Sequence, residues 1–288
     1  MKRIFTLLVF LSASALAFAQ PSNTGSSSEG NRIKLANGQK IVIESNTDIQ
    51  ASLAMGMELT SSSAAVNSLE VKNSTSSNYT ISNALTKMKV NVNMMGQSNS
   101  YNSDNKEGNS EEMAKYLDEK MNKQVNVLVD NVTGAATPEK KQEKKSDEAE
   151  NPDPTAGLLK MFADNSDEAV VSGAFEIIPK GKVAGDSWAD STTEKGTKTV
   201  RTFTLKSVNG NEAVINAVTV STGSNKLNFQ EMEFEVKTET KSNEEILMDI
   251  STGLVKKRTN AADITGSVQM MGQDMPISAK ATTTSIYK

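Results

Sequence analysis

Apolar and polar side chains alternate with a period of two from residue 33 onward, and this spacing predicts β-strands. The alternation is clear at residues 41–44, after an Asn37-Gly38 turn signal, and again at 53–59. It returns at 87–94, where apolar residues alternate with lysines and asparagines. Such a pattern is typical of an antiparallel sheet with one buried face and one face in water.

The second half of the chain continues the same pattern. Strand-like segments occupy residues 175–178, 200–208, 213–220, 227–236 and 246–250. Turn-forming residues separate them at 209–210, 222–225, 242–243 and 251–253. Because these links are short, we expect an antiparallel meander, which the extended tail at 262–287 continues.

One helix is predicted at residues 110–123. Asn109 is the expected N-cap and Glu112 completes a capping box. Its apolar stripe at helical spacing consists of Met113, Tyr116, Leu117 and Met121. A shorter helix is expected at 158–162. The predicted fold is therefore mainly β, a long curved antiparallel sheet forming a half-barrel or an open sandwich, with one to three covering helices.

The N-terminus predicts export. Lys2 and Arg3 precede an apolar stretch at 4–19, which ends in Ala17-Phe18-Ala19. This is the pattern of a signal peptide cleaved after Ala19. The stretch is shorter than the ~20 apolar residues that a membrane-spanning helix needs. We therefore expect a periplasmic or extracellular protein that keeps no integral membrane span after cleavage.

Changes in composition divide the chain into five parts. The predicted parts are a signal peptide at 1–19, a disordered leader at 20–32, a β-rich half at 33–136, a charged flexible loop at 137–154 and a β-meander half at 155–288. The two halves form either one domain or two. Short motifs recur between them, Met-Met-Gly-Gln at 94–97 and 270–273, and Asp-x-x-Thr-Gly at 130–134 and 249–253. These repeats indicate either a duplication or two uses of one hairpin turn.

Composition narrows the possible chemistry. The chain has no His and no Cys, which excludes imidazole- or thiol-based catalysis, disulfides and thiolate metal sites. Loss of Lys2 and Arg3 leaves 29 basic and 35 acidic side chains, a net charge of −6. That balance argues against nucleic acid as a partner and against a surface held to anionic lipid by charge. We expect no cofactor and no metal.

Methionine is the most distinctive candidate for chemistry, with 14 residues in the chain. Thioether ligation of Cu(I) is one interpretation and core filling is another. A third is that flexible Met, Leu and Val side chains line an adaptable apolar cavity. The predicted ligand-lining residues are Met55, Met57, Met88, Val90, Val92, Met94, Met113, Leu117 and Trp188.

Carboxylates are the only other candidates for catalysis. Asp164, Asp167 and Glu168 form one cluster, and Asp186 and Asp190 form another. Neither has the spacing of a calcium loop, so both are interpreted as solvated turns, with calcium as the alternative. A hydrolase that uses only carboxylates would require two acidic side chains facing each other across a cleft.

Residues 179–188, from Pro179 to Trp188, read Pro-Lys-Gly-Lys-Val-Ala-Gly-Asp-Ser-Trp. We expect Asp186 to cap a bend that leads Trp188 into a core, with ligand stacking as the alternative. Together with the signal peptide, the Asp-x-x-Thr-Gly turns and the C-terminal meander, this stretch resembles a family of secreted proteins of unknown function common in Bacteroidetes-type bacteria. The expected architecture is also similar to that of LolA-type periplasmic lipoprotein carriers. No activity and no functional residue follow from either resemblance.

These observations favour an exported soluble envelope protein that binds an apolar or amphipathic ligand, such as a lipid, or a partner protein of the envelope. The binding surface would be the concave Met/Leu/Val face of the sheet. The alternative is a structural or surface-interaction protein with a solid core and no ligand. A carboxylate-only hydrolase is the remaining alternative, and we expect no enzyme activity.

Overall fold

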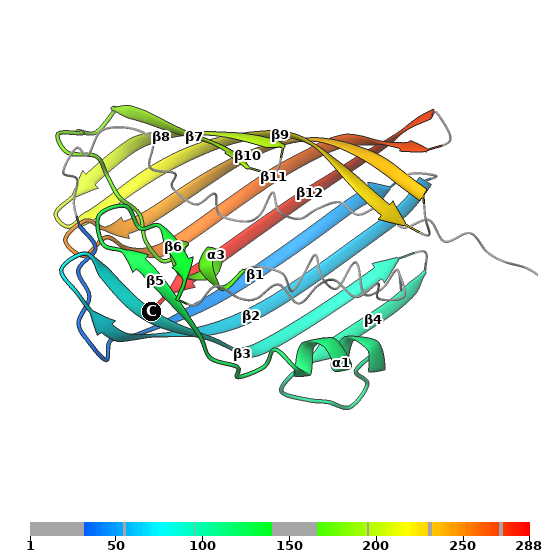
Figure 1. Cartoon of the computed structure of the whole chain (residues 1–288), viewed down its shortest axis with the longest axis horizontal. Helices are drawn as coiled ribbons and strands as arrows, with labels where there is room; N and C mark the ends of the chain where they lie inside the picture. Colours follow the sequence, from blue (N-terminus) through cyan, green and yellow to red (C-terminus); the bar gives the residue numbers. More distant parts are fainter. Residues whose placement is uncertain are drawn as a thin grey trace, which may run out of the picture.

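A computed structural model gives the fold of residues 32–53, 56–94, 96–139, 166–194, 196–229, 232–270 and 273–288. Within these residues, the chain forms one antiparallel sheet of twelve strands, which curves around one of two short helices while the other lies at the edge of the sheet (Figure 1). The strands are β1 Lys40–Leu53, β2 Met57–Ser74, β3 Asn78–Met94, β4 Gln97–Asn102, β5 Val125–Asp130, β6 Ala136–Pro138, β7 Ser187–Glu194, β8 Thr197–Asn209, β9 Glu212–Phe229, β10 Met232–Asp249, β11 Leu254–Met270 and β12 Gln273–Tyr287. The helices are α1 Glu111–Asp118 and α3 Asp167–Ser172.

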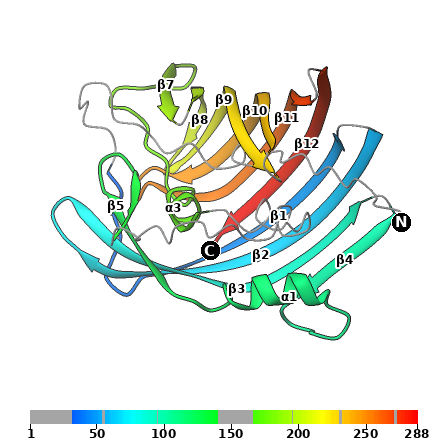
Figure 2. The same cartoon turned by 45° about the vertical axis from the view of Figure 1, so that its right-hand side comes forward.

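The sheet is continuous but does not close. Its strand order is β6-β5-β3-β2-β1-β12-β11-β10-β9-β8-β7, and β4 pairs with one half of β3. β1 pairs with both β2 and β12, so strands from both predicted halves belong to the same sheet. Figure 2 shows the resulting open curve, with β7 and β4 at opposite edges. The prediction of a mainly β, open, curved antiparallel sheet is confirmed.

Strand pairing defines the two faces. Residues directly opposite each other across neighbouring strands point to the same side of a sheet. The side that carries most of the buried residues is the concave face, which surrounds α3 (Figures 1 and 2). Exposed positions such as Val218 and Val220 of β9 lie on the other, convex face.

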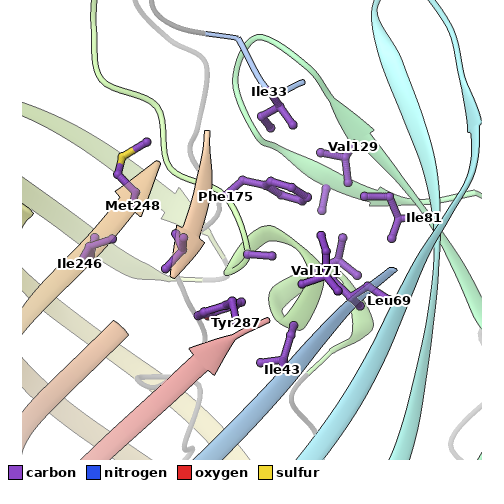
Figure 3. Packing of buried hydrophobic residues seen from close by; sticks show 14 of the residues in the cluster. Ile33, Ile43, Leu69, Ile81, Val129, Val171, Phe175, Ile246, Met248 and Tyr287 are labelled. Atoms are coloured by element: carbon purple, nitrogen blue, oxygen red, sulfur yellow. The ribbon is translucent and has the colours of Figure 1, made fainter. Parts of the chain in front are cut away.

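One end of the concave face is filled by an apolar cluster around α3. Val171 of α3 packs there with Ile43 of β1, Leu69 of β2 and Phe175, which follows the helix (Figure 3). Ile33 joins the same cluster ahead of the first strand, and its backbone N–H donates to Asn131 O. α3 begins at Ser166, whose Oγ accepts a hydrogen bond from Ala169 N at 3.2 Å. We call the apolar residues packed around α3, which include Ile33, Ile43, Leu69, Val171 and Phe175, the α3 cluster.

Several predicted boundaries are wrong. Residues 53–59 are not one strand, because the chain reverses there and Leu53 pairs with Met57. The turns predicted at 222–225 and 242–243 lie inside β9 and β10, which pair without interruption over both segments. Residues 175–178 form no strand, only a single bridge between Phe175 and Leu254. β7 was not predicted, and the Asn209-Gly210 and 251–253 turns are correct.

The predicted helix at 110–123 exists but is shorter. Its N-cap is Ser110, not Asn109, because Asn109 Oδ1 instead accepts from Asn102 N at 2.8 Å. Helix α3 was not predicted. The predicted helix at 158–162, the signal peptide at 1–19, the leader up to residue 31 and residues 140–154 of the predicted loop lie outside the described residues. Thr137 and Pro138 of that loop belong to β6.

The recurring motifs have the same role in both halves. Met94 pairs with Gln97 across the β3–β4 turn, and Met270 pairs with Gln273 across the β11–β12 turn. In the first Asp-x-x-Thr-Gly motif, Asp130 Oδ1 accepts from Thr133 N at 2.8 Å and Gly134 has φ 72°. Gly253 of the second motif has φ 74°. The hairpin-turn interpretation is therefore confirmed, since only glycine adopts this backbone conformation without strain.

Candidate functional site

The half of the concave face that lies away from the α3 cluster is apolar. The side chains of its residues point to the concave side of the sheet and are buried. They are Ile49, Ala51, Met57, Leu59, Met88, Val90, Val92, Val236, Ile264, Val268, Ile277, Ala279 and Ala281. We call this surface the apolar zone. It extends over β3, β2, β1, β12 and β11 to the edge of β10, close to the hairpin turns.

The structure brings most of the predicted ligand-lining residues together. Met57, Met88, Val90 and Val92 belong to the apolar zone, and Met94 packs against it. Met113 and Leu117 of α1 pack against the apolar zone, as does Tyr101 of β4. Met55 lies outside the described residues.

Trp188 is the exception among these predictions. It packs against the α3 cluster and stacks on Phe203, with ring centroids 5.2 Å apart and planes 6° apart. The bend before it is capped as expected, since Asp186 Oδ2 accepts from Val183 N at 3.0 Å. Trp188 is separated from the apolar zone because its strand, β7, is at the far edge of the sheet.

Helix α1 is held against β4 by a buried tyrosine. Tyr101 Oη donates to Asp118 Oδ1 at 2.8 Å, and Lys106 Nζ contacts the other oxygen of Asp118 at 3.1 Å. Burial and the neighbouring carboxylate raise the pKa of Tyr101 above its ordinary value. α1 contacts β4, and α3 contacts β3, β5 and β6. The two helices therefore cover one edge and one end of the concave face.

A polar row crosses the concave face between the apolar zone and the α3 cluster. Thr47 of β1 lies opposite Thr283 of β12, which lies opposite Asn260 of β11, which in turn lies opposite Glu244 of β10. Thr47 Oγ1 and Thr283 Oγ1 are 3.0 Å apart and hydrogen-bonded. The face is thus amphipathic along the strands, with hydrocarbon towards the hairpins and hydrogen-bonding groups in its middle.

The row ends in a buried cluster of charges. Glu244 accepts from Arg258 Nη1 at 2.8 Å and from Arg201 Nη2 at 2.7 Å. Arg258 Nη2 also contacts Glu176 Oε2 at 3.2 Å. Glu244 is 8% exposed and Arg258 is 3% exposed. The sequence analysis did not predict this cluster. A signal was present, because Arg201, Glu244 and Arg258 each occupy a position that alternates in step with the buried apolar residues of the same strand.

Two carboxyl groups in and beside this cluster have pKa values shifted in opposite directions. Burial alone would raise the pKa of Glu244, but Arg258 and Arg201 outweigh it and hold that pKa below its ordinary value. The pKa of Asp190 is raised, mainly by burial, while Arg201 opposes the shift and Glu176 adds to it. Glu244 therefore stays ionised and bound by arginine, which is the opposite of a general acid poised near neutral pH.

Asp190→Asn is expected to flatten part of the pH dependence of stability. Because the folded pKa of Asp190 lies above its unfolded value, folding favours the protonated form, and this contribution falls as pH rises through the folded pKa. The variant lacks that fall and is expected to be at least as stable as the wild type at pH 7. Urea unfolding between pH 4 and pH 7 checks this, and an unchanged pH profile would contradict it.

The other predicted carboxylate cluster is partly a helix. Asp167 and Glu168 form the first turn of α3 and not a solvated turn, and Asp167 Oδ1 accepts from Asn83 Nδ2 at 2.7 Å. Asp164 lies outside the described residues. Over the part of the chain that the structure describes, no group of three or more acidic residues is placed to hold a metal ion.

The sequence profile of a family of unknown function, DUF6263, matches residues 76–255, more than half of the chain. The chain belongs to this family. The expectation of a family of unknown function is confirmed at this level. A search of curated proteins found no match.

Three solved structures show limited likeness to this fold. Lipovitellin, from a structure of its lipid–protein interactions, has a TM-score of 0.46 and 11% identity over 88% of this chain and 25% of its own. OccK5 (OpdH) of Pseudomonas aeruginosa has a TM-score of 0.27 and 7% identity, covering 88% of this chain and 100% of its own. An outer membrane channel from Pseudomonas putida F1 has a TM-score of 0.25 and 8% identity, covering 92% and 100%. The chain spans about a quarter of the lipovitellin chain. TM-scores below 0.5 assign no function.

Among the described helices, none combines the length and the hydropathy needed to cross a membrane.

Proposed function

We propose that this protein is an exported envelope protein that binds an amphipathic ligand on the concave face of its sheet. The observation that carries the proposal is the border between the apolar zone and the polar row on one continuous face. Hydrocarbon binds apolar side chains without directional contacts, whereas a head group requires hydrogen-bonding partners at a fixed distance from it. This face provides both.

The side chains of the apolar zone suit a ligand of variable shape. Met57 and Met88 contribute unbranched thioethers, which change rotamer at low cost. Ala51, Ala279 and Ala281 also belong to the zone, and their short side chains take up little space above the strands. Carrier function of the LolA type is one form of this proposal, and capture of an apolar segment of an envelope protein is another.

Loss of apolarity in this zone is expected to weaken ligand binding. The double variant Val92→Thr and Val268→Thr keeps side-chain volume but places hydroxyls against the ligand hydrocarbon. Each unpaired buried hydroxyl costs about 1–3 kcal/mol, and 1.4 kcal/mol is tenfold in affinity. Titration of the processed protein with an environment-sensitive fluorescent lipid is the measurement. We expect affinity to fall at least tenfold.

The matched control uses the convex face. Val218 and Val220 are 48% and 36% exposed, so their replacement by threonine is expected to leave binding unchanged. Thermal unfolding of both double variants separates lost binding from lost folding. A wild type that does not bind the probe, or equal affinities for all three proteins, would refute the proposal in favour of a structural protein with a solid core.

Export has its own test. Produced with its native N-terminus in a Gram-negative host, the protein is expected in the periplasm or medium, starting at Gln20. Intact mass and N-terminal sequencing measure this directly. A cytoplasmic protein that retains residues 1–19 would contradict the export part of the proposal while leaving ligand binding open to its separate test.

A further inference from the structure

The apolar zone contains a buried polar atom that has no partner. Ser61 of β2 lies opposite Ile49 of β1 and Val92 of β3, both members of the zone. It is 6% exposed, and its Oγ makes no hydrogen bond. Leaving a buried hydroxyl unpaired costs free energy, so such an atom in a functional face indicates that a group from outside the described chain supplies the bond.

More hydrogen-bonding groups lie beside Ser61. Thr47 is two residues from Ile49 on the same strand and face, and it is paired with Thr283. In a hydroxyl–hydroxyl pair one hydrogen is used between the two oxygens, which leaves the second hydroxyl able to donate elsewhere. Next along the row, Asn260 Oδ1 is buried without a partner. We call Ser61 together with Thr47, Thr283 and Asn260 of the polar row the head-group row, although Ser61 is opposite Ile49 and so lies one step nearer the hairpin turns than the other three. It offers donors and acceptors but no formal charge.

The charges next to this row are already balanced. Glu244, opposite Asn260, is bound by Arg258 and Arg201, and Glu176 contacts both arginines. Two guanidinium groups thus face two carboxylates. An anionic head group at Ser61 and Thr47 would be buried without a counter-ion among the described residues, because the two guanidinium groups lie at the far end of the row and are already bound by carboxylates. Such burial of a charge is unfavourable. The electrostatics therefore favour an uncharged head group.

We propose that the ligand is a neutral glycerolipid-type amphiphile, with its hydroxyl- or ester-bearing head on the head-group row and its acyl chain on the apolar zone. This inference rests on the proposed function and adds the class and the orientation of the ligand. The head lies towards the middle of the strands, and the chain runs towards the hairpin turns. A ligand hydroxyl exchanges a hydrogen bond with Ser61 Oγ, and a second polar group of the head reaches the Thr47–Thr283 pair. Asn260 lies three strand spacings from Ser61, about 14 Å across the sheet, and is beyond the reach of the same head group.

The first test compares head groups on hydrocarbon chains of equal carbon number. Monooleoylglycerol, ionised oleate and the hydrocarbon 1-octadecene compete for the fluorescent lipid at pH 8, each below the concentration at which it aggregates. We expect monooleoylglycerol to bind about tenfold more tightly than either competitor, the effect of one or two hydrogen bonds. If oleate binds as tightly, the head-group assignment is wrong.

The second test removes the unpaired hydroxyl. Ser61→Ala is expected to weaken monooleoylglycerol about fivefold and to leave 1-octadecene unchanged, because only the head contacts Oγ. The matched control is Ser62→Ala, on the exposed side of the same strand, which is expected to change neither. The melting temperature of Ser61→Ala is expected to stay equal or to rise, since the variant loses an unsatisfied buried group.

The outcomes separate the two proposals. If the wild type binds none of the lipids, the proposed function fails and this inference fails with it. If all three lipids bind equally well, or Ser61→Ala weakens all three equally, the concave face is a lipid site but the head-group row does not read the head. Selective loss of monooleoylglycerol in Ser61→Ala supports both.

Discussion

Glu244→Gln is expected to lower the free energy of unfolding by about 3–5 kcal/mol, the usual cost of breaking a buried ion pair from one side. The variant removes the ionised carboxylate that Arg258 and Arg201 share, so the two buried guanidinium groups keep Glu176 as the ionised side chain that contacts both. Glutamine keeps the size of the side chain, so the loss reports charge and not packing. Urea unfolding of the processed protein at pH 7 is the measurement.

Glu245→Gln is the matched control, because Glu245 is the next residue of β10 and is exposed on the convex face. It is expected to change stability by less than about 0.5 kcal/mol. Equal unfolding midpoints for the two variants would show that the buried cluster does not stabilise the fold.

The same carboxylate predicts a pH dependence. The folded pKa of Glu244 lies below its ordinary value of 4.5, so its contribution is complete above that pH and is lost as pH falls through the folded pKa. The wild type is therefore expected to lose more stability than Glu244→Gln on acidification below pH 4.5. Acid unfolding curves of both proteins check this sign.

Ala281→Phe is expected to abolish ligand binding while the protein remains folded. Ala281 is 2% exposed and lies opposite Ile49 and Ala262 at the border of the apolar zone and the head-group row. A phenyl ring there occupies the space that the ligand chain requires. In a ligand site, the ring enters the space of the ligand and not that of other side chains. The free energy of unfolding is then expected to change by less than about 1 kcal/mol.

A solid core predicts a different result for this variant. Overpacking a filled core costs about 1–3 kcal/mol and has no binding to abolish. Thr282→Phe, on the exposed convex side of the same strand, is the matched control for adding an aromatic ring. Fluorescent-lipid titration and urea unfolding of both variants therefore distinguish a ligand site from a structural core.

The period-two pattern predicted the sheet because the buried residues of the long strands, where the structure describes their burial, fall mostly on one face. The turn predicted at 222–225 was wrong. The residues there, Thr222, Gly223, Ser224 and Asn225, are typical of a turn but continue strand β9. A side chain at Gly223 would meet Thr197 Oγ1 at 2.5 Å, so this glycine permits close approach of β8 and does not mark a turn. A long neighbouring strand overrides the local turn preference, and a single sequence does not show which strand is the neighbour.

The candidate site was partly predictable for the same reason. Met88, Val90 and Val92 followed from their spacing, since alternation on one strand is a local signal. The charges Arg201, Glu244 and Arg258 come from three different strands, β8, β10 and β11, and only the strand register brings them together. The sequence signal for this cluster was a charged residue at a position where the alternation predicts a buried side chain. Glu244, two residues before the buried Ile246, is an example. The oppositely charged partner that offsets the cost of burying such a charge can be identified only from the three-dimensional structure.

The central claim is that the concave face holds an amphipathic molecule. Its most direct test is native mass spectrometry of the processed protein, purified without detergent from its native envelope, followed by solvent extraction and lipid analysis. We predict an additional mass in the range of a single lipid, absent after extraction and absent from Ala281→Phe. A wild-type protein with only its polypeptide mass, and no lipid in the extract, would contradict the account.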